Sequence, residues 1–139
     1  MNYWLMKSEP STWSWQNQLD RGEAGEGWDG VRNHQASNNM KAMEIGDLAF
    51  FYHSVNEKQI VGIAEVIRLY HPDPTDASGR FGMVTIRAVK SMKVPVTLAQ
   101  IKADDRLQEM ALVRQSRLSV TPVSADQWAI IMSMGETNL

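Results

Sequence analysis

The sequence predicts an α+β protein in which an antiparallel sheet curls into a small barrel with short flanking helices. Three segments rich in aromatic and β-branched residues follow one another in mid-chain, at 47–54, 59–71 and 83–94. Helix-prone segments lie before and after this group and do not alternate with the strands, which argues against a parallel βαβ sheet. A curled antiparallel sheet also leaves few exposed edges. The length, 139 residues, is typical of one domain.

The first thirty residues are expected to form a strand, a helix and a loop. Residues 2–7 (NYWLMK) are aromatic and apolar, and the run stops before Pro10, which withholds a backbone donor, so a buried strand is predicted. A serine, Ser11 or Ser14, can cap a short amphipathic helix that follows. The glycine-punctuated stretch 22–30 ends that helix and forms a loop.

A second helix and a strand pair come next. Residues 33–43 place alanine and methionine at helical spacing, and Asn33 is a suitable cap for them. Gly46 and the residue after it break the helix. The segments 47–54 and 59–71 are separated by only four residues, which indicates two strands joined by a short loop.

The rest of the chain is predicted to contain a turn-rich loop, a strand, two helices, an extended segment and a last helix, over 72–82, 83–94, 97–114, 115–123 and 124–135 respectively. The strand alternates in hydropathy and is expected to end at Pro95. Ser124 is a capping residue for the last helix, and Gly135 stands at its end.

Composition and charge exclude several classes of protein. The absence of cysteine removes disulfides, thiolate nucleophiles and cysteine-based metal sites. No signal peptide or membrane span is recognisable, so a cytoplasmic location is expected. A net charge of −2 is not typical of a duplex-DNA binder. However, residues 1–30 contain two cationic and five anionic side chains, whereas residues 84–118 contain seven and three, so a basic face on an acidic body is possible.

No motif indicates an enzyme, a metal or a cofactor. The three histidines, His34, His53 and His71, have no metal-ligand spacing. The glycines form neither a P-loop nor a dinucleotide fingerprint, and no G-x-S-x-G elbow is present. A carboxylate pair for acid–base chemistry would most easily be drawn from Glu9, Asp29 and Asp47, but nothing in the sequence places two of them across one substrate. We therefore expect no catalytic residue and no cofactor.

The remaining polar and aromatic residues suit a pocket for a single unstacked base. Trp28 and Tyr52, with Trp4 or Trp13, offer flat faces for stacking, which contributes about 1 to 3 kcal/mol per base. Amide and hydroxyl groups that can meet the polar edge of a base are those of Ser8, Asn33, Gln35, Asn38 and Asn39. Cations that can meet phosphates are those of Lys7, Arg32 and Arg117.

Several of these residues also have a purely structural interpretation, and the sequence leaves both open. Trp28 is as compatible with the core as with a pocket, and Asn33 is as good a helix cap as a ligand contact. His53 follows an apolar strand, where a hydrogen-bonded structural histidine is common. Met40 and Met43 are expected in the core.

The chain resembles the EVE domain family, which includes thymocyte nuclear protein. The motifs that carry the resemblance occur in the family's order and extend from Tyr3 to about Ile131; they are YWLMKSEP, WDGVRNHQASNNM, GDLAFFYHS, IVGIAEV, HPDPT, PVTL and LVRQSRLSVTPV. The resemblance implies that residues 1–139 form a single PUA-like domain related to YTH domains. It also implies a noncatalytic module that recognises a modified base, above all modified cytosine in DNA, with modified RNA as the other candidate. Fusion to restriction-type nucleases in the family makes a nuclease partner conceivable.

The resemblance also implies which residues form the site. Trp28 forms a wall of the base-binding pocket beside Asp29, and Lys7, Ser8 and Glu9 form its floor. Rim and far-strand residues are Asn33, Gln35, Asn38, Tyr52, His53 and Ser54. Arg32 and Arg117 are the expected phosphate contacts, and Ser37 replaces an arginine that is common in the family. Alternative functions are the binding of a free nucleotide, nucleoside or other small ligand and, less favoured, an RNA-modifying enzyme.

Overall fold

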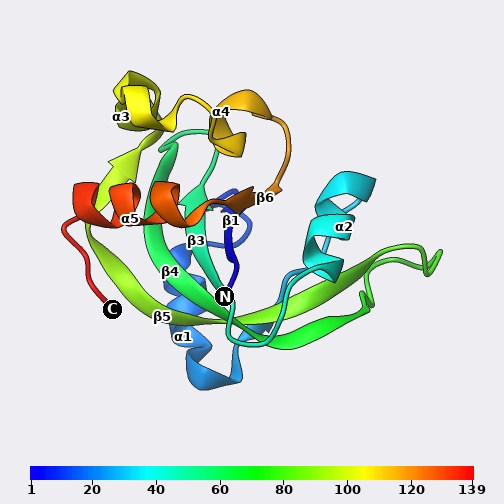
Figure 1. Ribbon diagram of the computed structural model, residues 1–139. Helices are drawn as coiled ribbons and strands as arrows, with labels where there is room; N and C mark the ends of the chain where they lie inside the picture. The colour runs from blue at the N-terminus through cyan, green and yellow to red at the C-terminus, as the bar shows by residue number, and fades with distance from the viewer.

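A computed structural model describes residues 1–139, and its centre is a six-stranded mixed sheet (Figure 1). The strands follow the order β2-β5-β4-β3-β1-β6. Their bounds are Tyr3–Ser8 (β1), Glu26–Gly27 (β2), Leu48–His53 (β3), Gln59–Pro72 (β4), Gly82–Thr97 (β5) and Val120–Val123 (β6). The α+β class predicted from the sequence is confirmed. None of the helices, of which the longest has ten residues, could span a membrane.

Five short α-helices and two 3-10 turns surround the sheet. The α-helices are α1 (Trp15–Asp20), α2 (His34–Lys41), α3 (Leu98–Ala103), α4 (Ala111–Arg114) and α5 (Ala125–Met134), and the 3-10 turns are Gly22–Ala24 and Asp105–Leu107. The predicted caps are present, because the side chains of Ser14, Asn33 and Ser124 each accept a hydrogen bond from the first turn of α1, α2 and α5.

The sheet departs from the predicted antiparallel barrel in two ways. First, β1 lies parallel to β3, with Tyr3 opposite Leu48 and Ser8 opposite His53. This pairing is possible because α1, β2 and α2 form a long crossover between the two strands. Second, the hydrogen-bonded order runs from β2 to β6 without closing. Closure of a barrel is therefore not confirmed. Register shifts between the long strands β4 and β5 mark β-bulges, which curl the sheet without closing it.

The strand β5 also continues past Pro95, where the sequence predicted an end. Pro95 lies between the paired residues Ser91 and Val96, at a place where the register between β4 and β5 shifts. A proline in such a bulge removes no ladder hydrogen bond, so the strand resumes beyond it.

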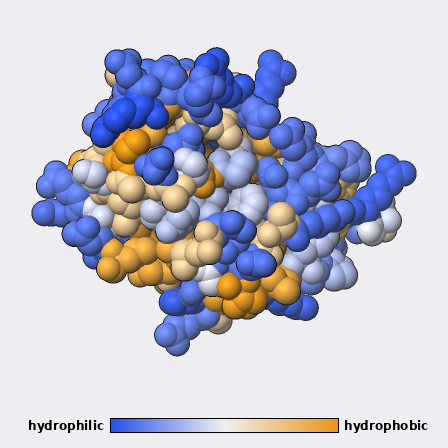
Figure 2. Space-filling model, in the orientation of Figure 1, coloured by the Kyte–Doolittle hydropathy of each residue, from blue (hydrophilic) through white to orange (hydrophobic).

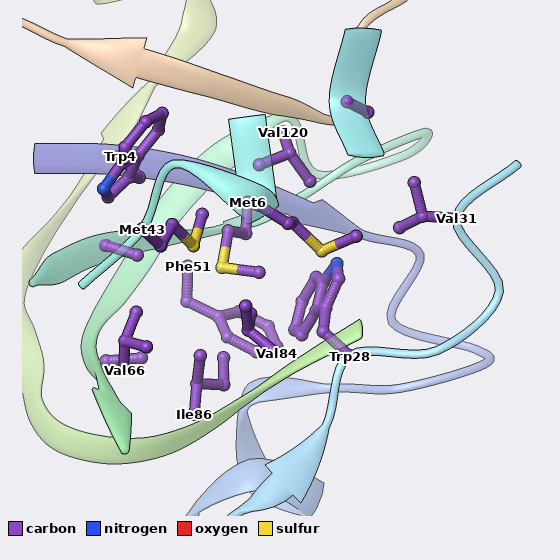
Figure 3. Packing of buried hydrophobic residues seen from close by; sticks show 14 of the residues in the cluster. Trp4, Met6, Trp28, Val31, Met43, Phe51, Val66, Val84, Ile86 and Val120 are labelled. Carbon is purple, nitrogen blue, oxygen red and sulfur yellow. The ribbon is translucent and has the colours of Figure 1, made fainter. Parts of the chain in front are cut away.

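Both faces of the sheet are buried in separate hydrophobic clusters. One cluster contains Met6, Phe51 and Trp28 and lies against α1 and α2 (Figure 3). The other contains Leu5, Phe50 and Trp128 and lies against the helices that follow β5. Neighbouring residues along β1 and β3 therefore point to opposite clusters, as the two-residue period of a strand requires.

The hairpin that joins β4 to β5 projects beyond the sheet and runs past α2 (Figure 1). In the same view the projecting end is largely hydrophilic, and hydrophobic atoms elsewhere form separate patches (Figure 2). The hairpin is fastened to α2 by the buried hydroxyl of Ser37, which lies 2.7 Å from the Tyr70 hydroxyl. The backbone N–H of Gly82 donates to the same Tyr70 oxygen.

Candidate ligand-binding cleft

A polar cleft opens beside the carboxyl end of β1. Its volume is about 490 Å³, within the roughly 300 to 1,000 Å³ range of small-ligand sites. Two short segments far apart in sequence supply its lining, namely the end of β1 with the turn after it and the β2 strand with the loop after it. The lining residues are Lys7, Ser8, Glu9, Thr12, Trp13, Glu26, Gly27, Trp28, Asp29 and Gly30.

One wall of the cleft is a tight turn that follows β1. The backbone N–H groups of Thr12 and Trp13 both donate to the Glu9 carbonyl oxygen at 2.9 Å. The Ser8 hydroxyl donates to the Trp13 carbonyl at 2.5 Å, which fixes the direction of the turn. The half-buried Trp13 ring is anchored by its Nε1–H, which donates to Gln18 in α1 at 3.0 Å. The turn therefore presents an aromatic ring and polar groups on one rigid frame.

The opposite wall is formed by Trp28 and its neighbours. The ring of Trp28 is only 7% exposed and meets Phe51 edge to face, with 5.4 Å between ring centroids (Figure 3). Its backbone N–H donates to Val84 in β5 at 2.8 Å. Trp28 is thus both a core residue and part of the cleft lining, so the two interpretations left open by the sequence are compatible.

Charge in the cleft is mixed, with an acidic excess. Lys7 is the one cation in the lining, and the carboxylates are those of Glu9, Glu26 and Asp29. The Lys7 ammonium donates to the Ser116 carbonyl at 2.6 Å, and burial lowers the pKa of Lys7. Glu26 forms an ion pair with Arg21 at 3.2 Å, whereas the exposed carboxylate of Asp29 has neither a hydrogen bond nor an ion pair. The cleft therefore disfavours anionic ligands and favours ligands that carry hydrogen-bond donors.

The cleft brings together five of the eleven predicted pocket residues, Lys7, Ser8, Glu9, Trp28 and Asp29. Those on α2 are outside the lining. Asn33 caps the helix by accepting from the Ala36 N–H at 3.0 Å. Gln35 donates to Gln115 at 3.4 Å, in the loop that also receives Lys7, and Asn38 is exposed with no side-chain hydrogen bond.

The three predicted residues of β3 and its end are also outside the lining. Tyr52 belongs to the cluster on the other face of the sheet, where burial raises its pKa. His53 Nε2 accepts from the Trp15 backbone N–H at 2.9 Å, so its Nδ1 carries the proton and donates to Glu57 at 3.1 Å. This is the structural role that the sequence left open for His53. The Ser54 N–H donates to the Ser8 carbonyl at 2.9 Å.

The two predicted phosphate contacts differ in their availability. Arg117 is exposed and its guanidinium makes no hydrogen bond or ion pair. The Arg32 guanidinium forms an ion pair with the buried Asp73 at 3.2 Å and donates to Thr75 at 3.0 Å, yet 41% of its side chain stays exposed.

Four lining residues were not predicted from the sequence, because no local pattern indicates that the two loops meet. They are Thr12, Glu26, Gly27 and Gly30.

The open mixed sheet and the tryptophan-lined cleft beside the carboxyl end of β1 define a small α+β fold with a polar cleft at one end of its first strand. The chain belongs to the EVE domain family, whose profile matches residues 2–134. It is 34% identical to thymocyte nuclear protein 1 of Mus musculus, over 98% of this chain and 74% of that protein.

Solved structures agree with this assignment. A crystal structure of a protein from Agrobacterium tumefaciens is 51% identical and superposes with a TM-score of 0.96, covering 99% of this chain and 94% of that one. The crystal structure of human THYN1 protein in complex with DNA containing 5-methylcytosine is 30% identical, has a TM-score of 0.92 and covers the whole of both chains. The Mmi1 YTH domain, 12% identical with a TM-score of 0.57, covers 96% of this chain and 86% of its own and shares the fold.

Proposed function

We propose that this protein is a noncatalytic reader of a modified base, with modified cytosine in DNA as its ligand. The observation that carries the proposal is the likeness over the full length to human THYN1 protein, which was crystallised with DNA containing 5-methylcytosine. The polar cleft supports it independently, because it combines two tryptophans with hydrogen-bonding groups in a volume suited to one base.

In this proposal the base enters between the two walls of the cleft. The half-buried Trp13 offers more ring surface than Trp28, so Trp13 stacks on the base and the edge of Trp28 closes the far side. The hydroxyl of Ser8 and the carboxylates of Glu9 and Asp29 lie where they can meet the polar edge, and a carboxylate is a suitable acceptor for the cytosine amino group.

Phosphates are held outside the cleft. Three carboxylates against one lysine disfavour a phosphate inside it. The unpaired Arg117, which directly follows the Lys7 contact at Ser116, is the stronger candidate for the strand, and Arg32 contributes through its exposed part. The remaining predicted pocket residues, Asn33, Gln35 and Asn38, contribute at most to the rim in this arrangement.

The alternative function is binding of a free nucleoside. The acidic net charge and the acidic lining of the cleft favour it, since a neutral nucleoside meets no phosphate repulsion.

The alternative to DNA is an RNA strand that carries the modified base. We propose no catalytic step, because Glu9 and Asp29 are both exposed and no histidine or lysine contacts either carboxylate; the Glu9 carboxylate accepts a hydrogen bond from the Ser11 hydroxyl at 3.1 Å. The 139 residues are proposed to form one EVE domain, and a cytoplasmic location stays a prediction.

The test is a binding series with short oligonucleotides of one sequence that carry cytosine, 5-methylcytosine or 5-hydroxymethylcytosine at a single position. A matched oligonucleotide carries N6-methyladenine. Fluorescence anisotropy of labelled single strands and duplexes, in DNA and RNA, gives each Kd. Preference for a modified cytosine in DNA is expected. Equal affinity for every oligonucleotide contradicts the proposal. Arg117→Ala serves as a matched control that should weaken all oligonucleotides alike and leave the preference unchanged.

A further inference from the structure

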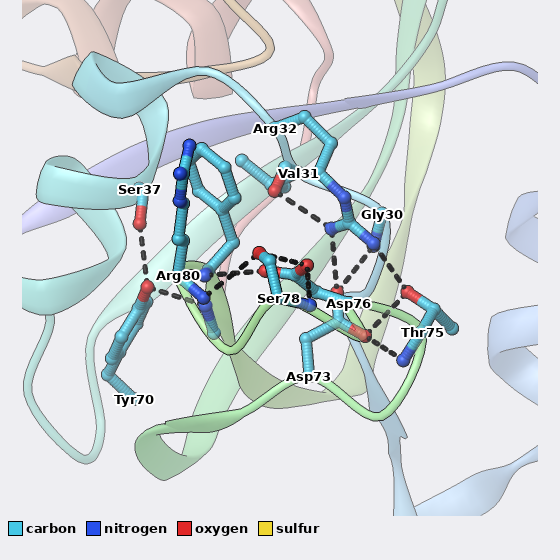
Figure 4. Close-up of polar contacts among 12 residues, drawn as sticks. Gly30, Val31, Arg32, Ser37, Tyr70, Asp73, Thr75, Asp76, Ser78 and Arg80 are labelled. Atoms are coloured by element: carbon cyan, nitrogen blue, oxygen red, sulfur yellow. Dashed lines mark hydrogen bonds and ion pairs between the residues drawn. The ribbon is translucent and has the colours of Figure 1, made fainter.

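The motif HPDPT, residues 71–75, places one buried carboxylate in a hydrogen-bond network at the start of the loop that connects β4 to β5 (Figure 4). The Asp73 side chain has no exposed surface. One of its oxygens, Oδ1, accepts from the backbone N–H and the hydroxyl of Thr75 at 2.7 and 2.6 Å. The other, Oδ2, accepts from the Gly30 N–H at 2.8 Å and from Arg32 at 3.2 Å. Both oxygens are therefore fully used, one by the hairpin and one by the loop after Trp28.

This network ends at the wall of the polar cleft. Gly30 lines the cleft and is followed by the buried Val31. The segment from Trp28 to Gly30 is fastened at its start by the Trp28 N–H bond to Val84 and at its end by the Gly30 N–H bond to Asp73. Gly30 has a φ of +80°, a conformation that residues with a side chain rarely adopt.

Arg32 completes the connection between loop and hairpin. Its guanidinium donates to the Val31 carbonyl at 3.1 Å as well as to Asp73 and Thr75. The hydrogen bonds to Asp73 outweigh the effect of its burial and lower the pKa of this carboxyl to about 2. The carboxylate is thus ionised at neutral pH, and a charged acceptor makes stronger hydrogen bonds than a neutral one.

We propose that Asp73 is a positioning residue for the polar cleft: without touching the ligand, it holds the Trp28–Gly30 wall in the conformation that receives the base. The inference rests on the proposed function, since the ligand class is the same. A wall held at both ends loses little conformational freedom when a ligand binds, which raises affinity and selectivity for a base of fitting shape.

The variant Asp73→Asn tests this inference. The amide of asparagine has only one oxygen, so it can accept hydrogen bonds from the loop or from the hairpin but not from both. Its NH₂ group then faces the donors on the other side. We expect a loss of about 3- to 10-fold in the affinity for the preferred modified oligonucleotide, and a smaller loss for its unmodified counterpart, so that the preference declines. The matched control is Asp76→Asn, in the same hairpin, whose carboxylate accepts only from Ser78 and Phe81.

A spectroscopic measurement separates positioning from a general loss of stability. In ¹H–¹⁵N spectra the Gly30 amide proton of the wild type should lie downfield because it donates to a carboxylate, and it should move upfield in Asp73→Asn but not in Asp76→Asn. If Asp73→Asn does not fold, Thr75→Val, at an exposed position outside the cleft, replaces it. This variant removes the hydrogen bond from the Thr75 hydroxyl to the Asp73 carboxylate and should lower the affinity for the preferred oligonucleotide by a smaller factor.

Two outcomes overturn the inference. One is a folded Asp73→Asn with wild-type affinity and preference, and the other is an equal loss in Asp76→Asn. A wild-type protein that shows no preference among oligonucleotides contradicts the proposed function instead, and the Gly30 amide then still reports whether Asp73 holds the wall. The two failures are therefore distinguishable.

Discussion

Two tryptophans line the cleft, but they differ in how far each serves the core. Trp28 is 7% exposed and packs on Phe51, so its truncation leaves a large cavity, whereas Trp13 is half-buried at the edge of the same cluster. Truncation of a fully buried tryptophan costs about 3 to 5 kcal/mol of folding free energy. Binding data on Trp28→Ala alone would therefore report loss of folding as well as loss of a contact.

Trp13→Ala is accordingly the sharper test of base stacking. We expect this variant to remain folded and to bind the preferred oligonucleotide about 1 to 3 kcal/mol more weakly, because one stacked ring is lost. Titration by anisotropy, with urea denaturation of the same sample, separates affinity from stability. Trp128→Phe, on the other face of the sheet, is the control and should bind normally. Unchanged affinity in Trp13→Ala would exclude stacking on this ring.

Single residues also show what the sequence could predict of the site. The resemblance to the EVE family implied Lys7, Ser8 and Glu9, and Trp28 was singled out because it stands in a glycine-rich loop; all four lie in the cleft lining together with Asp29. The predicted contacts on α2 and β3 lie outside the lining because the alternation of a strand shows which residues share a face but not which face adjoins the cleft. Tyr52, for example, is separated from the Phe51 cluster only by the alternation of strand β3.

At the scale of elements, the start of α2 is predicted to depend on Asn33. Asn33→Ala removes the side-chain acceptor for the Ala36 N–H and should lower the free energy of unfolding by about 1 kcal/mol. Asn33→Ser keeps a cap and should retain most of the stability. Chemical denaturation measures both. Oligonucleotide affinity should be the same in the two variants once they are folded, and a loss confined to binding in Asn33→Ser would instead assign Asn33 to the ligand.

The β4–β5 hairpin should contribute a pH-dependent part of the stability. The pKa of Asp73 is lowered from 3.8 to about 2 because hydrogen bonds from Thr75, Gly30 and Arg32 outweigh the effect of burial. A lowered pKa stabilises the fold above the unfolded-state value, and this stabilisation is lost as the pH falls from about 4 to about 2. Screening at this surface loop reduces the expected contribution to about 1 to 2 kcal/mol.

Comparison with Asp73→Asn isolates this contribution, since other carboxylates also titrate in acid. Asp104 has a pKa of about 2 because of its hydrogen bonds to Arg106, but it is present in both proteins. Thermal unfolding between pH 2 and pH 7 should show a stability difference between wild type and variant that is constant above pH 5 and narrows below pH 4. A difference independent of pH would mean that Asp73 acts through shape rather than through charge.

The elements themselves were largely predictable, and their pairing was not. Helix caps and strand runs are local, so Ser14, Asn33 and Ser124 could be recognised in the sequence. The passage of β5 through Pro95 depends on a bulge between two strands, and a single strand's sequence does not show it.

For the whole molecule, the unpredicted parallel pairing of β1 with β3 is also what builds the cleft. Because β1 enters between β3 and β6, its carboxyl end and the turn after it face the loop after β2, some twenty residues later in the chain. The long crossover that the sequence suggested only as helix and loop therefore creates the cleft.

The charge distribution of the whole molecule sets the dependence of binding on salt, which distinguishes a strand reader from a nucleoside binder. With a net charge of −2 and an acidic cleft, the proposed phosphate contacts are few, namely Arg117 and Arg32. Each phosphate contact adds about −0.7 to −0.9 to the slope of log K against log salt, so a total slope of about −1 to −2 is expected for an oligonucleotide. Arg117→Ala should reduce the magnitude of that slope by about 1. The free modified nucleoside, measured by calorimetry over the same salt range, should bind with a slope near zero. If oligonucleotide binding is equally insensitive to salt, no phosphate is held and the ligand is the nucleoside itself.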